Sequence, residues 1–305
     1  MKKNLVKKAV LPALVALLCS VVALTSVSYA WFTMGNEASV DGMQMNVKTA
    51  GGLQISASGN EGTFKSNLLL SDLKAVNSNQ LLVDAEGNLV EVQPVSTDGT
   101  VSNGALSFFT GEIENGALAK AAASTGNYIC FDIYVKVTAE NKLYLDAGSV
   151  VKMVTGTDTH LATRVAFVNL GYASTAAEAQ GMTPGKFTAS NAVKIWEPNA
   201  LIRSQAVKNA GNQTHGKQQY YKGIASVDGT TPVLSENNVT TFAPIQNDNL
   251  ETTAAEELFA LGEGYNRIRV YIWLEGQDVD CVNEVSGGTF AITLNFKQDD
   301  LSNKA

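Results

Sequence analysis

The chain of 305 residues carries 22 lysines and arginines against 29 aspartates and glutamates, a formal net charge of −7. A surface of this sign repels the phosphates of nucleic acids and offers no basic stripe to anionic lipids, so we expect neither as a partner. The length suffices for one large core or two small ones.

The first thirty residues have the parts of a secretory signal peptide. Four lysines lie within the first eight residues, and an apolar stretch over 9–24 follows them. That stretch is shorter than the ~20 residues that span a bilayer. Ser28 and Ala30 are small residues at positions minus three and minus one of a cleavage site before Trp31. We therefore expect residues 1–30 to be removed, so that the membrane contact is transient; an uncleaved anchor is the alternative.

The residues around this site resemble the start of a known group of exported proteins. The stretch "SYAWFT" and, after a short polar turn, "ASVDGMQMNVKTAGGLQIS" are similar to Gram-positive proteins processed by the SipW-type signal peptidase. That group includes the biofilm fibre protein TasA and camelysin. The similarity is clearest over residues 15–57. It implies that a SipW-type peptidase acts on this chain and that the mature protein begins with Trp31 and Phe32.

Alternation of apolar and polar residues predicts strands over the strongest segments. Segments with this pattern are 43–47, 53–57, 128–137, 267–275 and 289–296. In the segment 267–275 the alternation places Arg267, Arg269, Tyr271, Trp273 and Glu275 on the outward face. Two further segments, 150–154 and 164–170, are more continuously apolar. This composition favours central strands that are covered on both faces.

Helical signals are few and short. Capping boxes that begin at Thr175 and Thr253 predict helices ending near Gly181 and Gly262, and the alanine-rich segment 115–124 favours a third. Because so few helices cannot cover the predicted sheets, the sheets must pack on each other. We therefore expect an all-β, jelly-roll-like β-sandwich with short connecting helices and long-range antiparallel pairing.

The mature chain, 31–305, is expected to form one sandwich domain with long insertions near 58–104 and 205–250. These two stretches are rich in serine, asparagine, glycine, threonine and glutamine, which is typical of surface loops. After cleavage two cysteines remain, Cys130 and Cys281. Export makes a disulfide between them feasible, and two free thiols are the alternative.

No arrangement of residues typical of a catalytic site is evident. The two histidines, His160 and His215, lie in polar stretches without the His-Glu-x-x-His spacing of a zinc protease, although camelysin-like proteins have been labelled metalloproteases. Neither a Gly-x-Ser-x-Gly motif nor a Walker-type glycine loop occurs. We expect no enzymatic activity and no cofactor.

Two groups of residues are candidates for ligand binding. The acidic group, a weak candidate for calcium, is Glu275, Asp278 and Asp280. A solvated acidic turn is the favoured alternative, because the EF-hand spacing is absent. The aromatic group, which could stack on sugar rings, is Trp196, Tyr271 and Trp273. Its favoured alternative is cross-strand aromatic pairing, with Arg267 or Arg269 stacked over a ring.

Cleavage would free an aromatic arm of about Trp31 to Ala38, ahead of a strand over 39–47. Such an arm can pair with the exposed sheet edge of a neighbour and so extend a filament. The residues expected to take part are Trp31, Phe32, Val40, Met43 and Met45. The resemblance to TasA implies the same mode, since TasA-like proteins are understood to build fibres by donor-strand complementation of a jelly roll.

The predicted function is therefore a secreted structural subunit of an extracellular matrix or surface fibre. Its expected partners are further copies of the chain, the SipW-type peptidase and an accessory anchoring protein. A monomeric surface adhesin or glycan-binding sandwich is the alternative.

Overall fold

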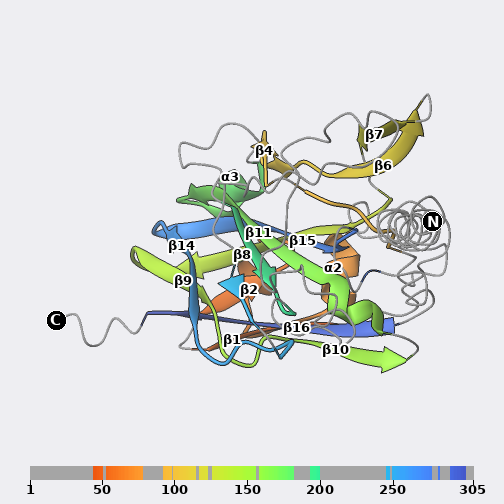
Figure 1. Cartoon of the computed structure of the whole chain (residues 1–305). Coiled ribbons are helices and arrows are strands. Elements are labelled where there is room, and N and C mark those ends of the chain that lie inside the picture. The colour runs from red at the N-terminus through yellow and green to blue at the C-terminus, as the bar shows by residue number, and fades with distance from the viewer. Residues whose placement is uncertain are drawn as a thin grey trace, which may run out of the picture.

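The structure is a computed structural model of the chain. It describes residues 44–50, 53–77, 92–97, 99–114, 117–122, 126–155, 158–181, 193–199, 245–247, 249–276, 281 and 289–299. These residues form two large sheets, two small ones and a few short helical segments (Figure 1). The helical segments are η1 (Glu61–Thr63), α2 (Leu70–Asn77), η2 (Asp158–Ala162) and α3 (Ala176–Gly181). Across this described part, no helix has the length and apolar character needed to cross a membrane.

The first large sheet, sheet A, has six strands. They are β14 (Glu256–Leu261), β9 (Asn141–Leu145), β16 (Thr289–Gln298), β1 (Gln44–Ala50) and β3 (Asn67–Leu69) in spatial order, with β10 (Val150–Thr155) also against β16. β1 lies between β16, to which it is parallel, and β3, to which it is antiparallel. β9 and β10 are both antiparallel to β16 and pair with different parts of it. The strand nearest the N-terminus among the described residues is therefore a central strand.

The second large sheet, sheet B, also has six strands. In spatial order they are β13 (Ile245–Gln246), β12 (Val193–Glu197), β11 (Thr163–Ala173), β15 (Gly264–Leu274), β8 (Ile129–Val137) and β2 (Gln54–Ser56). All neighbours are antiparallel except β12 and β13. Two separate hairpins are β4 (Val101–Ser102) with β5 (Ala105–Leu106), and β6 (Phe109–Glu114) with β7 (Ala117–Ala122).

The two large sheets bury their facing sides against each other. Phe167 of β11 meets Phe296 of β16 across the interface, with ring centroids 5.7 Å apart and an edge-to-face angle of 81°. The apolar residues that alternation placed inward in the strand segments of 128–137, 267–275 and 289–296 all belong to this core. The predicted all-β sandwich is confirmed, whereas its jelly-roll connectivity stays a prediction. The parallel pairing of β1 with β16 differs from the expected antiparallel order.

The outer face of sheet B is also covered, although the alternation in β15 predicted an outward face there. Phe108 packs on Trp273 with ring centroids 5.2 Å apart and stacks on Tyr128 at 4.2 Å. The backbone N–H of Val95 donates to the carbonyl of Leu274 at 3.0 Å, which ties the covering segment to the end of β15. The sandwich therefore has a third, partial layer, and the outward residues of β15 do not face solvent.

One of the three predicted helices is confirmed and two are wrong. α3 begins with the predicted capping box: the Glu178 N–H donates to Thr175 Oγ1 at 3.3 Å, and the Thr175 N–H donates to Glu178 Oε2 at 3.2 Å. The segments 253–262 and 115–124 instead contain strands β14 and β7. In β14, Leu258 and Phe259 enter the core, and this burial outweighs the local helix signal of the Thr253 box.

The prediction of central strands is right for one segment and wrong for the other. β11 is buried along nearly all its length. β10 lies at the lower rim of sheet A (Figure 1), and its Met153 and Val154 are 49% and 44% exposed. The expected insertion near 58–104 is more than surface loop, because Leu68 and Leu73 belong to the core. Most of the insertion near 205–250 lies outside the described residues.

Candidate functional site

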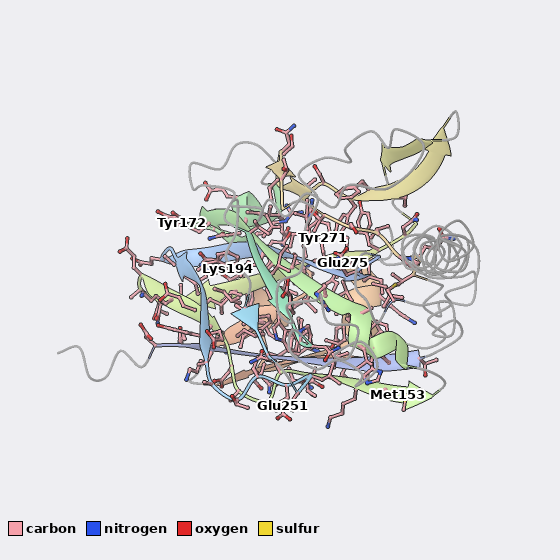
Figure 2. The ribbon with its side chains drawn as sticks, viewed as in Figure 1. Met153, Tyr172, Lys194, Glu251, Tyr271 and Glu275 are labelled. Carbon is pink, nitrogen blue, oxygen red and sulfur yellow. The ribbon has the colours of Figure 1, made fainter. Side chains whose placement is uncertain are left out.

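The aromatic group does not form an exposed platform, so the less favoured of its two interpretations, a sugar-stacking surface, is wrong. Trp196 and Trp273 are 0% exposed and Tyr271 is 2% exposed. Trp196 lies in the core between the sheets, whereas the other two lie under the third layer. Figure 2 shows Tyr271 in the interior of the molecule. Sugar rings cannot reach these side chains, because packing on both faces of sheet B encloses them.

Polar contacts hold these aromatic residues in place. Trp196 Nε1 donates to Asn247 Oδ1 at 2.7 Å, and the backbone N–H of Leu106 donates to the Tyr271 hydroxyl at 3.1 Å. An arginine does lie over a ring, but the ring belongs to Tyr134 and not to the predicted group: the Arg267 guanidinium is 5.6 Å from its centroid. The group is a structural element, since its polar atoms are satisfied within the protein.

Glu275, the first of the calcium candidates, is fully buried. It accepts a hydrogen bond from Trp273 Nε1 at 3.0 Å and one from Ser96 Oγ. Its carboxylate thus joins β15 to the covering segment and does not belong to a solvated turn. Asp278 and Asp280 lie outside the described residues. Among the residues that are described, no group of three or more histidine, cysteine, aspartate or glutamate side chains could hold a metal ion.

A buried ion cluster occupies the outer face of sheet B. Asp132 of β8 accepts hydrogen bonds from Arg267 Nε and Nη2 at 3.0 and 2.6 Å, and from Arg269 Nε and Nη2 at 2.7 and 3.0 Å. Burial alone would raise the pKa of Asp132, but the hydrogen bonds and charges of the two arginines outweigh it and lower that pKa. Asn77 at the end of α2 bonds the Asp132 backbone through both side-chain amide atoms. The Asn77 side chain thus fastens α2 to the backbone of β8, and the ion cluster joins β8 to β15.

The structure has no disulfide between Cys130 and Cys281, which was one of the two alternatives that the sequence left open. Cys130 packs against the apolar side chains under the third layer, whereas Cys281 belongs to the core between the two large sheets. Burial raises the pKa of the Cys130 thiol to about 12, so it stays protonated at neutral pH. Of the histidines, His160 lies in η2 and His215 is outside the described residues.

Sheet edges are the places where a β-sandwich can accept a further strand. Both edges of sheet B are closed within the described residues. At β2, Ile55 exchanges two backbone hydrogen bonds of 2.9 Å with Lys65. At the other edge, β13 has only two residues, and its Ile245 is buried.

Two of the three edges of sheet A are protected as well. At β3, the outward N–H of Leu69 donates to the carboxylate of Asp72 at 2.8 Å. At β14, Glu256 and Glu257 are exposed, and a register shift follows Glu257. Charged side chains and bulges are common devices that keep an edge from pairing. Neither edge is suited to a further strand.

Within the described residues, the third edge, that of β10, has an outer partner only as far as Val151. Its inner side pairs with β16, and its outer side carries one isolated bridge, between Val150 and Glu251. Beyond that bridge Met153 and Val154 expose apolar side chains. Figure 2 shows Met153 and Glu251 at the lower rim of the molecule. This edge also carries the exposed Lys152 and a register shift between Met153 and Thr155, the same kinds of feature that protect β14.

Of the predicted donor residues, the described part includes only Met45, which lies in β1 opposite Ile292 of β16. Trp31, Phe32, Val40 and Met43 lie outside it, as do Ser28 and Ala30 at the predicted cleavage site. The expected strand over 39–47 is described from Gln44 onward.

Comparison with known proteins does not identify this chain. No protein-family model matches it, and neither a curated protein nor a solved structure does. The likeness to TasA and camelysin thus rests on the short sequence stretches at the N-terminus.

Proposed function

We propose that the mature chain is a secreted structural subunit that assembles with copies of itself into an extracellular fibre or matrix. The observation that carries this proposal is the position of β1. This strand begins shortly after the expected cleavage site and lies in the middle of sheet A, hydrogen-bonded on both sides. A neighbouring molecule that binds the residues before Gln44 would therefore be connected through β1 to the core of this one.

Cleavage is the switch in this proposal. While the signal peptide is attached, the membrane holds the donor arm, Trp31 to Ala38. Release by a SipW-type peptidase makes the arm available to the edge of another copy, a heterologous contact that extends without closing. The subunit has a structural role and no catalytic one, and an accessory protein anchors the fibre to the cell surface.

The adhesin or glycan-binding alternative loses one of its two supports, because Trp196, Tyr271 and Trp273, the expected aromatic surface, are all buried. Its other support, the long loops, lies mostly outside the described residues. The position of β1 therefore leads us to propose the fibre subunit.

Electron microscopy of three purified forms tests the fibre proposal. The first form begins at Trp31, the second begins at Ser39 and lacks the donor arm, and the third retains residues 1–30 in detergent. We expect filaments from the first form alone. Filaments from the form that begins at Ser39 would contradict a role for the arm, and dispersed particles from all three forms would contradict the fibre proposal itself.

A further inference from the structure

We propose that the side chains of Lys48 and Asn295 join in an isopeptide bond, which fastens β1 covalently to β16. Among the described strands β1 is the first along the chain and β16 is the last, and the two are hydrogen-bonded neighbours in sheet A. The inference goes beyond the proposed fibre function and does not depend on it.

Four residues lie in one row across sheet A. Lys48 of β1 is paired with Asn295 of β16 on one side and with Asn67 of β3 on the other. Asp146, directly after β9, continues the row, because its N–H donates to the carbonyl of Asn295 at 2.7 Å. Neighbouring strands of a sheet lie about 4.8 Å apart. The row therefore brings an amine, a carboxamide and a carboxylate to consecutive positions.

This row lies on the outer face of sheet A. Successive residues of a strand alternate between the two faces of a sheet. The residues next to the row along these strands are buried in the core, and they are Val47, Leu68, Leu145, Leu294 and Phe296. The row itself therefore faces away from the core. The carboxylate of Asp146 is on this outer face as well, since its Oδ1 lies 3.5 Å from Lys297 Nζ.

The two asparagines beside Lys48 each have a buried oxygen atom without a hydrogen bond. Asn295 Nδ2 donates to the carbonyl of Ala147 at 3.1 Å. Within the described residues, however, neither Asn295 Oδ1 nor Asn67 Oδ1 has a partner. Buried acceptors of this kind are costly and therefore rare. The N–H of an isopeptide at Lys48 would lie between the two asparagines, where it can donate to Asn67 Oδ1.

The reaction is aminolysis of the Asn295 side-chain amide. Lys48 Nζ forms a bond to Asn295 Cγ, and the bond from Cγ to Nδ2 breaks. Two protons pass from the lysine ammonium to the departing nitrogen, which leaves as ammonium. Asp146 is the carboxylate placed to carry these protons, and it ends unchanged. The reaction therefore needs no oxidant, metal or second substrate.

A slow rate is sufficient, because the bond forms once in the life of each molecule. Holding the two reacting groups on adjacent strands replaces a bimolecular encounter by an intramolecular one, which raises the rate by orders of magnitude. In a fibre joined through the N-terminal arm, tension would reach β1 first. The bond would pass that tension to β16 without unfolding the residues between them.

The first test is the intact mass of the denatured chain that begins at Trp31. We expect a mass about 17 Da below that of the sequence, because the reaction releases ammonia. Lys48→Arg keeps the positive charge but cannot form the bond, so it should have the full mass of its sequence. Lys152→Arg, which changes an exposed lysine of β10 in the same sheet, is the matched control and should keep the loss. Circular dichroism of each variant establishes that it folds.

The second test locates the bond. Trypsin does not cleave after an acylated lysine, so a digest of the parent chain should contain residues 31–65 joined to residues 270–297. Fragmentation of this species should assign the link to Lys48 and Asn295. Asp146→Asn removes the proton carrier, so most of the freshly purified variant should have the full mass of its sequence. Complete cross-linking of Asp146→Asn would overturn the role of Asp146.

Three results would overturn the bond itself. The first is the full sequence mass in the folded parent chain, which would show that Lys48 keeps a free amine. The second is a loss of ammonia that persists in Lys48→Arg, because the loss would then arise elsewhere in the chain. The third is a link from Lys48 to Asn67. Filament formation plays no part in these measurements, so this inference and the proposed fibre function can fail independently.

Discussion

Replacing Asp132 by asparagine tests whether the buried ion cluster stabilises sheet B by joining β8 to β15. The substituted amide would keep the shape of the side chain but remove its charge. Arg267 and Arg269, whose side chains are 13% and 12% exposed, would then face each other without a carboxylate. The four hydrogen bonds from these arginines would lose their charged acceptor.

The size of the effect follows from this burial. Removing one partner of a buried ion pair typically costs about 3–5 kcal/mol, because the remaining charge stays desolvated. The remaining arginines keep a little contact with water, so we expect a loss of about 3 kcal/mol in the free energy of unfolding. Urea denaturation of the form that begins at Ser39 measures this loss without a contribution from assembly.

A matched control is the exposed ion pair between Lys142 and Glu257, 2.7 Å long with side chains about half exposed. Glu257→Gln should change the free energy of unfolding by less than about 1 kcal/mol. A loss of less than about 1 kcal/mol for Asp132→Asn would refute the account of the cluster, since it would make the buried pair equivalent to a surface one.

The cluster also predicts the sign of a pH effect. The pKa of Asp132 is lowered in the folded state, so its contribution to stability is present above the pKa of the unfolded chain. That contribution is lost as the pH falls through the lowered folded-state pKa. The stability difference between the parent and Asp132→Asn should therefore be constant near neutral pH and shrink in acid.

Further predictions concern packing and burial. Gly264→Ala should lower the free energy of unfolding, measured by urea denaturation, by about 2 kcal/mol or more. Gly264 has a φ of 108°, and an added Cβ would lie 2.4 Å from the Ala173 carbonyl oxygen. An unchanged denaturation midpoint would contradict this strand geometry. The Cys130 thiol should react with a thiol reagent at pH 8 only after unfolding, since burial raises its pKa to about 12, and rapid reaction of the native protein would show that the third layer is open. In the form that begins at Ser39, Trp196 and Trp273 are the only tryptophans, and iodide should barely quench their fluorescence because both are buried. Strong quenching would show that these side chains are exposed to solvent.

Sequence patterns predicted the facing sides of the sandwich well, because period-two alternation reports burial of one face directly. In β8, β15 and β16 the predicted apolar positions all lie in the core. The same patterns wrongly suggested that the outward residues of β15 face solvent, whereas several of them are buried under the third layer. Alternation shows which residues differ in polarity, but it does not show that a distant segment, here the one around Phe108, covers the other face.

The edge strand was the hardest element to predict. The apolar run of β10 resembles that of β11, yet one lies at a rim and the other in the middle of a sheet. Local composition cannot distinguish them, since the difference depends on how many strands pair with each. The capping box at Thr253 failed for a related reason, because pairing of β14 with β9 is a long-range contact that a local signal does not contain.

Sedimentation of the mature protein at increasing concentration tests the central claim most directly, namely that a freed N-terminal arm joins one subunit to the next. Large species that pellet should appear above a threshold concentration for the chain that begins at Trp31, and the chain that begins at Ser39 should remain monomeric throughout. If both chains sediment as monomers at every concentration, or if both form the same large species, the arm does not link subunits and the account is wrong.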